Sequence, residues 1–153
     1  MYSCFFIGHR DSPFSIQEEV DHAVEKLVME CGVSEFIVGS HGQFDQMATA
    51  AGQRAIQAHP EKEIIALKLE PYFPGDREII VPHYFDNFYY PDGMESVPPR
   101  FCIEKANRKV LDEVDFLVTY IRRDGGNAAK LYRRALAKQK RGEIRVINLG
   151  SLL

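Results

Sequence analysis

Three times along this chain, a short apolar run leads into a turn that contains glycine, and a segment with helical periodicity follows. The apolar runs cover residues 4–7, 36–38 and 116–121, and the turns contain Gly8, Gly39 with Gly42, and Gly125 with Gly126. Runs this short are typical of buried strands, and their alternation with amphipathic helices is typical of parallel sheets with right-handed crossovers. The alternation therefore predicts an α/β fold with a mainly parallel sheet of about five strands.

The expected strands are 3–7, 35–38, 63–69, 116–121 and 145–149, and the expected helices are 15–31, 45–59, 99–113 and 127–141. Ser15 and Glu18 match a capping box, which predicts the start of the first helix. From 70 to 98 the pattern breaks into a stretch rich in proline and aromatic residues. A structureless loop of that length is unusual, so we expect a short helix or strand within it and a position over the ligand edge as a lid. Its aromatic side chains either stack on a base or anchor the loop to the core.

Composition limits the class of protein. A length of 153 residues with 45% hydrophobic residues suits one domain with its own core. A net charge of -3 gives no overall attraction to DNA or to an anionic membrane. No apolar segment is long enough to span a membrane, and the start of the chain lacks the order of a signal peptide. We therefore expect a single cytoplasmic domain over residues 1–153.

The three cysteines, Cys4, Cys31 and Cys102, lie far apart in the sequence, and each has apolar neighbours. They match neither a disulfide framework nor a zinc site, and a free cysteine behaves as a small apolar residue in a core. We expect reduced, packed thiols, no metal ion and no cofactor.

The glycine turns carry the candidate site. In a parallel sheet the carboxyl ends of the strands meet at one edge, where such folds bind ligands. Glycine lets a ligand approach the main chain, and the unpaired amides at a helix start favour a phosphate. We therefore expect a nucleotide-type small molecule at this edge. The candidate residues from the three turns are Gly8, His9, Arg10, Gly39, Ser40, His41, Gly42, Asp45, Gly125, Gly126 and Asn127.

Two further candidates come from the helix expected at 99–113. Asn107 falls on its apolar stripe and Arg108 lies at the margin. A buried asparagine needs hydrogen-bond partners, so Asn107 either ties down a neighbouring loop or reaches into the site. Arg108 and Arg10 are candidates for binding a phosphate, because the guanidinium fork matches its oxygens. The two histidines of the turns, His9 and His41, either donate to the ligand or stabilise their own turns.

Taken together, these motifs resemble the SLOG superfamily, and within it a group of small standalone bacterial proteins, first described as a domain of unknown function, that are related to the YpsA-like proteins. The motifs that carry the resemblance are Ile7-Gly-His-Arg10, Val38-Gly-Ser-His-Gly-Gln-Phe-Asp45, Ala106-Asn-Arg108, Val114-Asp-Phe-Leu-Val-Thr-Tyr120, Gly125-Gly-Asn-Ala128 and Val146-Ile-Asn-Leu149. They cover nearly the whole chain in order and are thinnest between residues 70 and 98.

The resemblance implies a Rossmann-like three-layer fold whose glycine turns hold a nucleotide or a nucleotide-derived small molecule, in a binding or sensing module. It also implies self-association. Enzymes of the superfamily, the phosphoribohydrolases, carry a PGGxGTxxE motif whose Glu supports cleavage of an N-glycosidic bond. Here Ala129 and Tyr132 stand where that motif has Thr and Glu. Because the usual general acid or base is missing, binding without turnover is the leading hypothesis.

The alternative is a hydrolase or transferase acting on a nucleotide or nucleotide sugar, with Asp11, Asp45 or Asp124 in place of the missing Glu. A third hypothesis comes from the last helix, which is strongly basic, and from a DNA-handling branch of the same superfamily. A solvated helix face explains those charges, and the chain has no recognisable DNA-reading motif. We do not expect a nucleic-acid partner.

Overall fold

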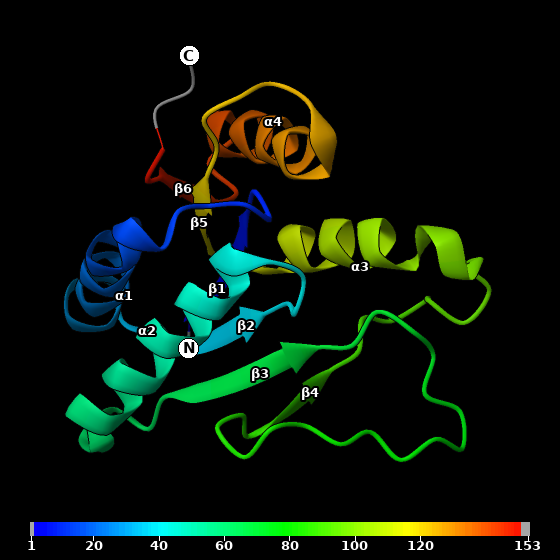
Figure 1. Cartoon of the computed structure of the whole chain (residues 1–153), viewed down its shortest axis with the longest axis horizontal. Helices are drawn as coiled ribbons and strands as arrows, with labels where there is room; N and C mark the ends of the chain where they lie inside the picture. The colour runs from blue at the N-terminus through cyan, green and yellow to red at the C-terminus, as the bar shows by residue number, and fades with distance from the viewer. Residues whose placement is uncertain (1, 151–153) are drawn as a thin grey trace.

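The computed structural model describes residues 2–150, which form a six-stranded sheet between two pairs of helices (Figure 1). The strands are β1 (Tyr2–Gly8), β2 (Val33–Val38), β3 (Ile65–Leu69), β4 (Asn87–Tyr89), β5 (Phe116–Tyr120) and β6 (Arg145–Asn148). The helices are α1 (Gln17–Cys31), α2 (Gln43–Ala58), α3 (Pro99–Glu113) and α4 (Gly126–Lys140), with short 3-10 turns η1 (Phe14–Ile16) and η2 (Pro60–Lys62). The strand order is β4-β3-β2-β1-β5-β6, and every neighbouring pair is parallel. The expected Rossmann-like α/β fold is confirmed.

One strand more than expected completes the sheet. The sequence placed about five strands, and the sixth is β4, which pairs with β3 at the edge, with Leu67 opposite Asn87. It lies inside the 70–98 stretch, where a short helix or strand was expected. Three residues are too few to show an alternating pattern, so this strand depends on a pairing partner about 20 residues earlier in the chain.

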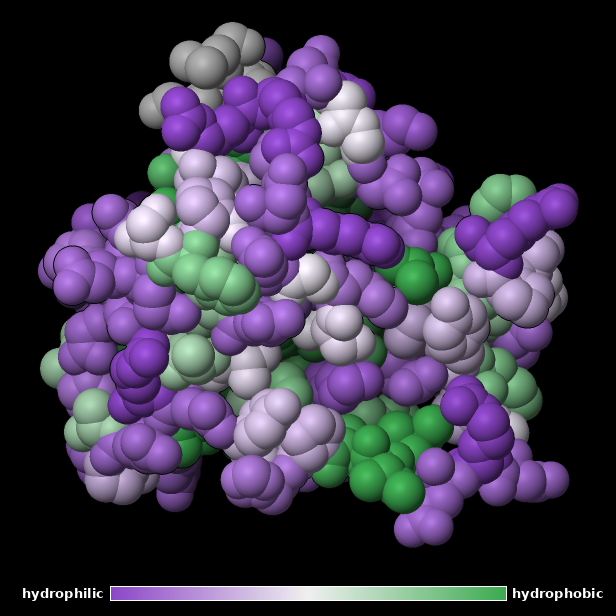
Figure 2. Space-filling model, viewed as in Figure 1, coloured by the Kyte–Doolittle hydropathy of each residue, from purple (hydrophilic) through white to green (hydrophobic). Residues whose placement is uncertain are grey.

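The connection from β3 to β4 follows the outer edge of the sheet. Figure 2 shows apolar atoms gathered over this connection on an otherwise mostly hydrophilic face. Ile80 in this connection is 82% exposed, whereas Phe85 is buried and packs with the core. One aromatic side chain therefore anchors the connection, as one of the two alternatives predicted, while Tyr72, Phe73 and Tyr84 remain exposed.

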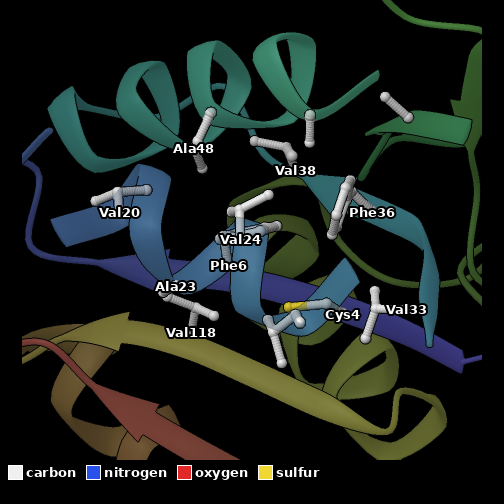
Figure 3. Close-up of a cluster of buried hydrophobic side chains, with 14 of the residues drawn as sticks. Cys4, Phe6, Val20, Ala23, Val24, Val33, Phe36, Val38, Ala48 and Val118 are labelled. Carbon is white, nitrogen blue, oxygen red and sulfur yellow. The ribbon is translucent and has the colours of Figure 1, made fainter. Parts of the chain in front are cut away.

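The core has two halves, one on each face of the sheet, because successive strand residues point to opposite faces. Cys4 and Phe6 pack toward α1 and α2, whereas Phe5 packs toward α3 and α4. Figure 3 shows that small side chains such as Ala23 and Ala48 line the contact of α1 and α2 with the sheet. Small residues let both helices approach closely, which fixes where their ends meet the carboxyl edge of the sheet.

The start of α1 differs from the expectation. Within residues 2–150, Ser15 makes no capping hydrogen bond; the chain forms the 3-10 turn η1 instead, and α1 begins at Gln17 after Ile16. The 3-10 turn closes when the amide of Ile16 donates to the carbonyl of Pro13, at 3.2 Å. The side chain of Gln17 then donates to the carbonyl of Met47, at 3.0 Å, which links α1 to α2.

The three cysteines are free thiols; Cys4 and Cys102 are buried and Cys31 is half-buried. Within residues 2–150, no helix is both long enough and apolar enough to cross a bilayer.

Candidate functional site

A cavity of about 500 Å³ lies at the carboxyl edge of the sheet, between the turns that follow β1, β2 and β5. We call it the first cavity. The strand order reverses between β1 and β5, and ligands of open α/β sheets bind at such a point. Three turns far apart in the sequence thus converge there, and α3 closes one side.

The first cavity brings together ten of the thirteen candidate residues. They are Gly8, His9, Arg10, Gly39, His41, Asp45, Asn107, Gly125, Gly126 and Asn127. Asn107 reaches the cavity wall and has no side-chain hydrogen bond within residues 2–150, so it is available to a ligand.

Three candidates lie outside the first cavity. Ser40 and Gly42 line an adjoining second cavity of about 370 Å³, which shares Gly39 and Asp45 with the first. Arg108 is exposed on α3, 4.0 Å from the carboxylate of Glu104, and lines a separate shallow depression. Neighbouring helix positions differ by about 100° in direction, so the side chain that follows Asn107 points away from the sheet.

His9 in the first turn is held by the protein itself. It is buried, and its Nε2 accepts a hydrogen bond from the amide of Arg122 at 3.2 Å. Burial and the charge of Arg123 lower the pKa of His9, which keeps the ring neutral and suited to accept that bond. The side chain therefore joins the turn after β1 to the turn after β5, the structural alternative for this histidine.

The second turn, 39–45, was one of the three turns expected to bind an anion, but the protein uses two of its amides. The amide of His41 donates to Oδ2 of Asp45 at 2.8 Å, and the amide of Gln43 donates to the carbonyl of Arg10 at 2.8 Å. Gly42 has a φ of 120°, and a Cβ atom there would lie 2.6 Å from Cα of Arg10. Glycine at this position thus serves the close contact between two turns.

The third turn is the open one. Gly125 and Gly126 have φ values of 118° and 82°, and a Cβ atom on either would have no neighbour within 4 Å. The amides of Gly126, Asn127 and Ala128 at the start of α4 have no acceptor within residues 2–150. Free amides and the positive end of a helix dipole, facing a cavity, form an anion site.

Asp45 is the carboxylate at the junction of the two cavities. Burial raises its pKa to about 6, although the amide of His41 and the charge of Arg10 act in the opposite direction. Its Oδ2 also limits the position of Gly39, where a Cβ atom would lie 2.9 Å away. The group can accept hydrogen bonds from hydroxyls or exchange a proton near neutral pH.

His41 is exposed between two cations. Burial of part of its ring, then the charges of Arg10 and Lys68, lower the pKa of His41. A neutral imidazole can donate one hydrogen bond and accept another.

Some residues of the cavity were not among the thirteen candidates, although Asp124 was considered as an alternative acid and Arg123 as an alternative phosphate partner. They are Phe5, Phe6, Ile7, Ile103, Arg123, Asp124 and Ala128. Ile103 could have been found from the sequence, because it lies one helical turn before Asn107 on the same face of α3. Arg123 is paired with Asp11 at 2.9 Å, and Asp124 is paired with Arg133. These two ion pairs flank the third turn and leave its amides open.

No residue of the 70–98 stretch lines the first cavity, so this stretch does not form the expected lid over that cavity. Its residues Pro82, Tyr84 and Phe85 line the second cavity instead. Pairing of β4 at the sheet edge holds this stretch beside β3, one strand beyond β2. Within residues 2–150, no group of three or more His, Cys, Asp or Glu side chains is arranged to hold a metal ion.

Comparisons with known proteins bear on the fold. No family model matches the chain, and no curated protein matches it in sequence. Among solved structures, it is similar to DNA processing protein A (DprA) from Streptococcus pneumoniae, with a TM-score of 0.62 and 15% sequence identity. The match covers 99% of this chain and 52% of the DprA chain, so this chain spans about half the length of that protein. The likeness shows a shared Rossmann-like fold.

Proposed function

We propose that this chain binds a nucleotide or a nucleotide-derived small molecule in the first cavity. The observation that carries the proposal is the set of free amides at the start of α4, which open onto a cavity at the reversal point of a parallel sheet. A phosphate satisfies those amides and the helix dipole together. The resemblance of the glycine turns to the SLOG superfamily supports membership of that superfamily and the same class of ligand.

The surrounding side chains suggest how the rest of the ligand lies. Arg10 is exposed at the cavity rim and has no carboxylate partner within residues 2–150, so it is available to pair with a phosphate. Asp45 has one oxygen engaged by His41 and can accept hydrogen bonds from ribose hydroxyls with the other. The amide of Asn107 offers both a donor and an acceptor on the opposite wall.

Binding without turnover is our first candidate, because Tyr132 replaces the Glu of the phosphoribohydrolase motif. A hydrolase or transferase is the second candidate, since the pKa of Asp45 near 6 suits a general acid or base. Incubation with a panel of nucleotides and nucleotide sugars separates the two: a binding module returns them unchanged. Turnover that is lost in Asp45→Asn, with binding retained, would favour the enzyme.

A test of the binding site exploits the helix dipole. Asn127→Asp adds a carboxylate at the second residue of α4, where it stabilises the helix by about 0.3–1 kcal/mol but repels a phosphate. We expect unchanged or higher thermal stability and at least about a tenfold loss of nucleotide affinity in calorimetry. Gln43→Glu is the matched control, because it adds an acid at the start of α2 outside both cavities.

Mass spectrometry of small molecules released from the denatured protein identifies the natural ligand. If no nucleotide of the panel binds, or if Asn127→Asp binds as tightly as the wild type, the proposal is wrong. A nucleic-acid function is not favoured by the basic face of α4. Arg133 and Arg134 are paired with Asp124 and Asp112, and Lys138 lies 3.2 Å from Glu143.

A further inference from the structure

The second cavity adjoins the first at the turn after β2. Both are lined by Gly39 and Asp45, so the Asp45 carboxylate lies at their boundary. One side of the second cavity is a single face of α2 that presents Gln46, Thr49 and Gln53. Lys68 of β3 and Tyr84 of the β3–β4 connection form other parts of its wall.

Charge in the second cavity is unbalanced. Lys68 is half-buried and is its only cationic lining residue, yet no carboxylate lies within ion-pair distance of it in residues 2–150. Many other cations of the chain do have partners, for example Arg54 with Asp21 at 2.7 Å and Arg134 with Asp112 at 2.8 Å. Among residues 2–150, Asp45 is the only acid in the lining, and its Oδ2 already accepts from the amide of His41. A partly desolvated cation without a partner favours an incoming anion.

The positive field extends across the junction between the cavities. Arg10 on one side and Lys68 on the other both act on the ring of His41. The side-chain amides of Gln46 and Gln53 make no hydrogen bond within residues 2–150, so they add free donors next to Lys68. An anion there would meet the positive charge of Lys68 and several uncharged hydrogen-bond donors.

We propose that the ligand spans both cavities, with one anionic group at the start of α4 and a second paired with Lys68 beyond Asp45. This inference rests on the proposed function and narrows its ligand class to nucleotides that carry two separate anionic groups. The second group is either a phosphate on the ribose or the carboxylate of an attached sugar acid, because both offer the same chemistry to an ammonium group. Asp45 then lies beside the neutral, hydroxyl-rich middle of the ligand.

The test uses two pairs of probes that differ only at the second group. One pair is UDP-glucuronate and UDP-glucose, and the other is adenosine 3′,5′-bisphosphate and adenosine 5′-monophosphate. Calorimetry of each probe with the wild type, Lys68→Gln and Lys62→Gln gives the affinities. Lys62 is the matched control, since it is an exposed lysine of η2 remote from both linings.

In one pair, we expect the probe that carries the second anionic group to bind about tenfold more tightly than the probe that lacks it. Lys68→Gln should remove that preference without changing the affinity of the probe that lacks the second group, and Lys62→Gln should retain the preference. Equal affinities within both pairs would overturn this inference while leaving the proposed function intact. A preference that survives in Lys68→Gln would overturn the assignment of Lys68, and a failure of all four probes to bind would count against both proposals.

Discussion

At the scale of single residues, Gly8 is fixed by packing as well as by its place on the cavity wall. A Cβ atom on Gly8 would lie 2.6 Å from Cγ of Phe44, which is 1% exposed at the start of α2. Gly8→Ala therefore forces Phe44 and the helix start to move, at a cost of about 1–3 kcal/mol in the free energy of unfolding. Urea denaturation followed by circular dichroism measures this loss.

Gly52→Ala is the control for that measurement. Gly52 lies inside α2, and a Cβ atom there would have an ordinary contact, 3.7 Å from the ring of Phe36. Replacing a helical glycine by alanine at such a site stabilises a protein by about 0.4–1 kcal/mol. If Gly8→Ala is as stable as the wild type, or gains stability as Gly52→Ala does, the close packing of Gly8 against Phe44 does not hold in solution.

The raised pKa of Asp45 leads to a second prediction for a single residue. Its pKa is 3.8 ordinarily and about 6 in the folded chain, so between these values the folded chain holds a proton that the unfolded chain releases. Stability from this group is therefore greatest at low pH and falls as pH rises through that window. Asp45→Asn removes the titration, and its side-chain oxygen can still accept from the amide of His41.

We expect Asp45→Asn to be more stable than the wild type at pH 7.5 by about 1–2 kcal/mol, after allowance for partial exposure of the carboxyl group. The difference should shrink toward zero at pH 4. Urea unfolding at several pH values tests this, with exposed Asp92→Asn as control. A difference that does not depend on pH would contradict the raised pKa.

At the scale of elements, α4 combines an open start with a face of paired charges. Arg133 forms an ion pair with Asp124 and Arg134 with Asp112. Arg141 and Lys138 both pair with Glu143. Because the arginines are already engaged, the double variant Arg133→Glu, Arg134→Glu should lose about 1 kcal/mol of stability through like-charge contacts. Fluorescence anisotropy with a labelled single-stranded oligonucleotide should show no salt-dependent DNA binding for either the wild type or the variant. DNA binding by the wild type that this variant abolishes would establish the nucleic-acid hypothesis instead.

At the scale of the whole molecule, the sequence predicted the elements whose signal is local. The apolar runs at β1, β2 and β5 were found because burial on both faces of a parallel sheet favours apolar residues in a strand, and α3 was found from apolar residues at spacings of three and four. The strand β4 was expected only as a short helix or strand somewhere in 70–98, because its three residues depend on pairing with β3. Asn107, on the apolar stripe, lines the first cavity, whereas Arg108, chosen for its guanidinium, lines a separate depression.

In the candidate site too, some features could be predicted from the sequence and others depend on contacts in the folded chain. Convergence of three turns follows from strand direction alone, and the sequence predicted which turns would meet. It did not predict which turn would keep free amides, because that depends partly on contacts between turns. The carboxylate of Asp45 accepts from the amide of His41 within the second turn itself, whereas the carbonyl of Arg10 reaches the amide of Gln43 only when β1 and β2 are side by side. Within residues 2–150, the third turn has no such partner and stays open.

The last prediction concerns the convergence of the three turns on the first cavity. If one ligand binds in the first cavity, residues 8–12, 39–45 and 124–128 should gain protection from hydrogen exchange together, although up to about 115 residues separate them in the chain. The exterior faces of α1 and β6 lie away from the cavity and should exchange at the same rate with and without ligand. Hydrogen exchange with mass spectrometry, using a nucleotide found in the calorimetric panel, measures this pattern. Asn127→Asp should lose the protection in all three segments, because the phosphate at α4 holds the ligand against the other two turns. Protection confined to one segment would mean that the three turns do not share a ligand.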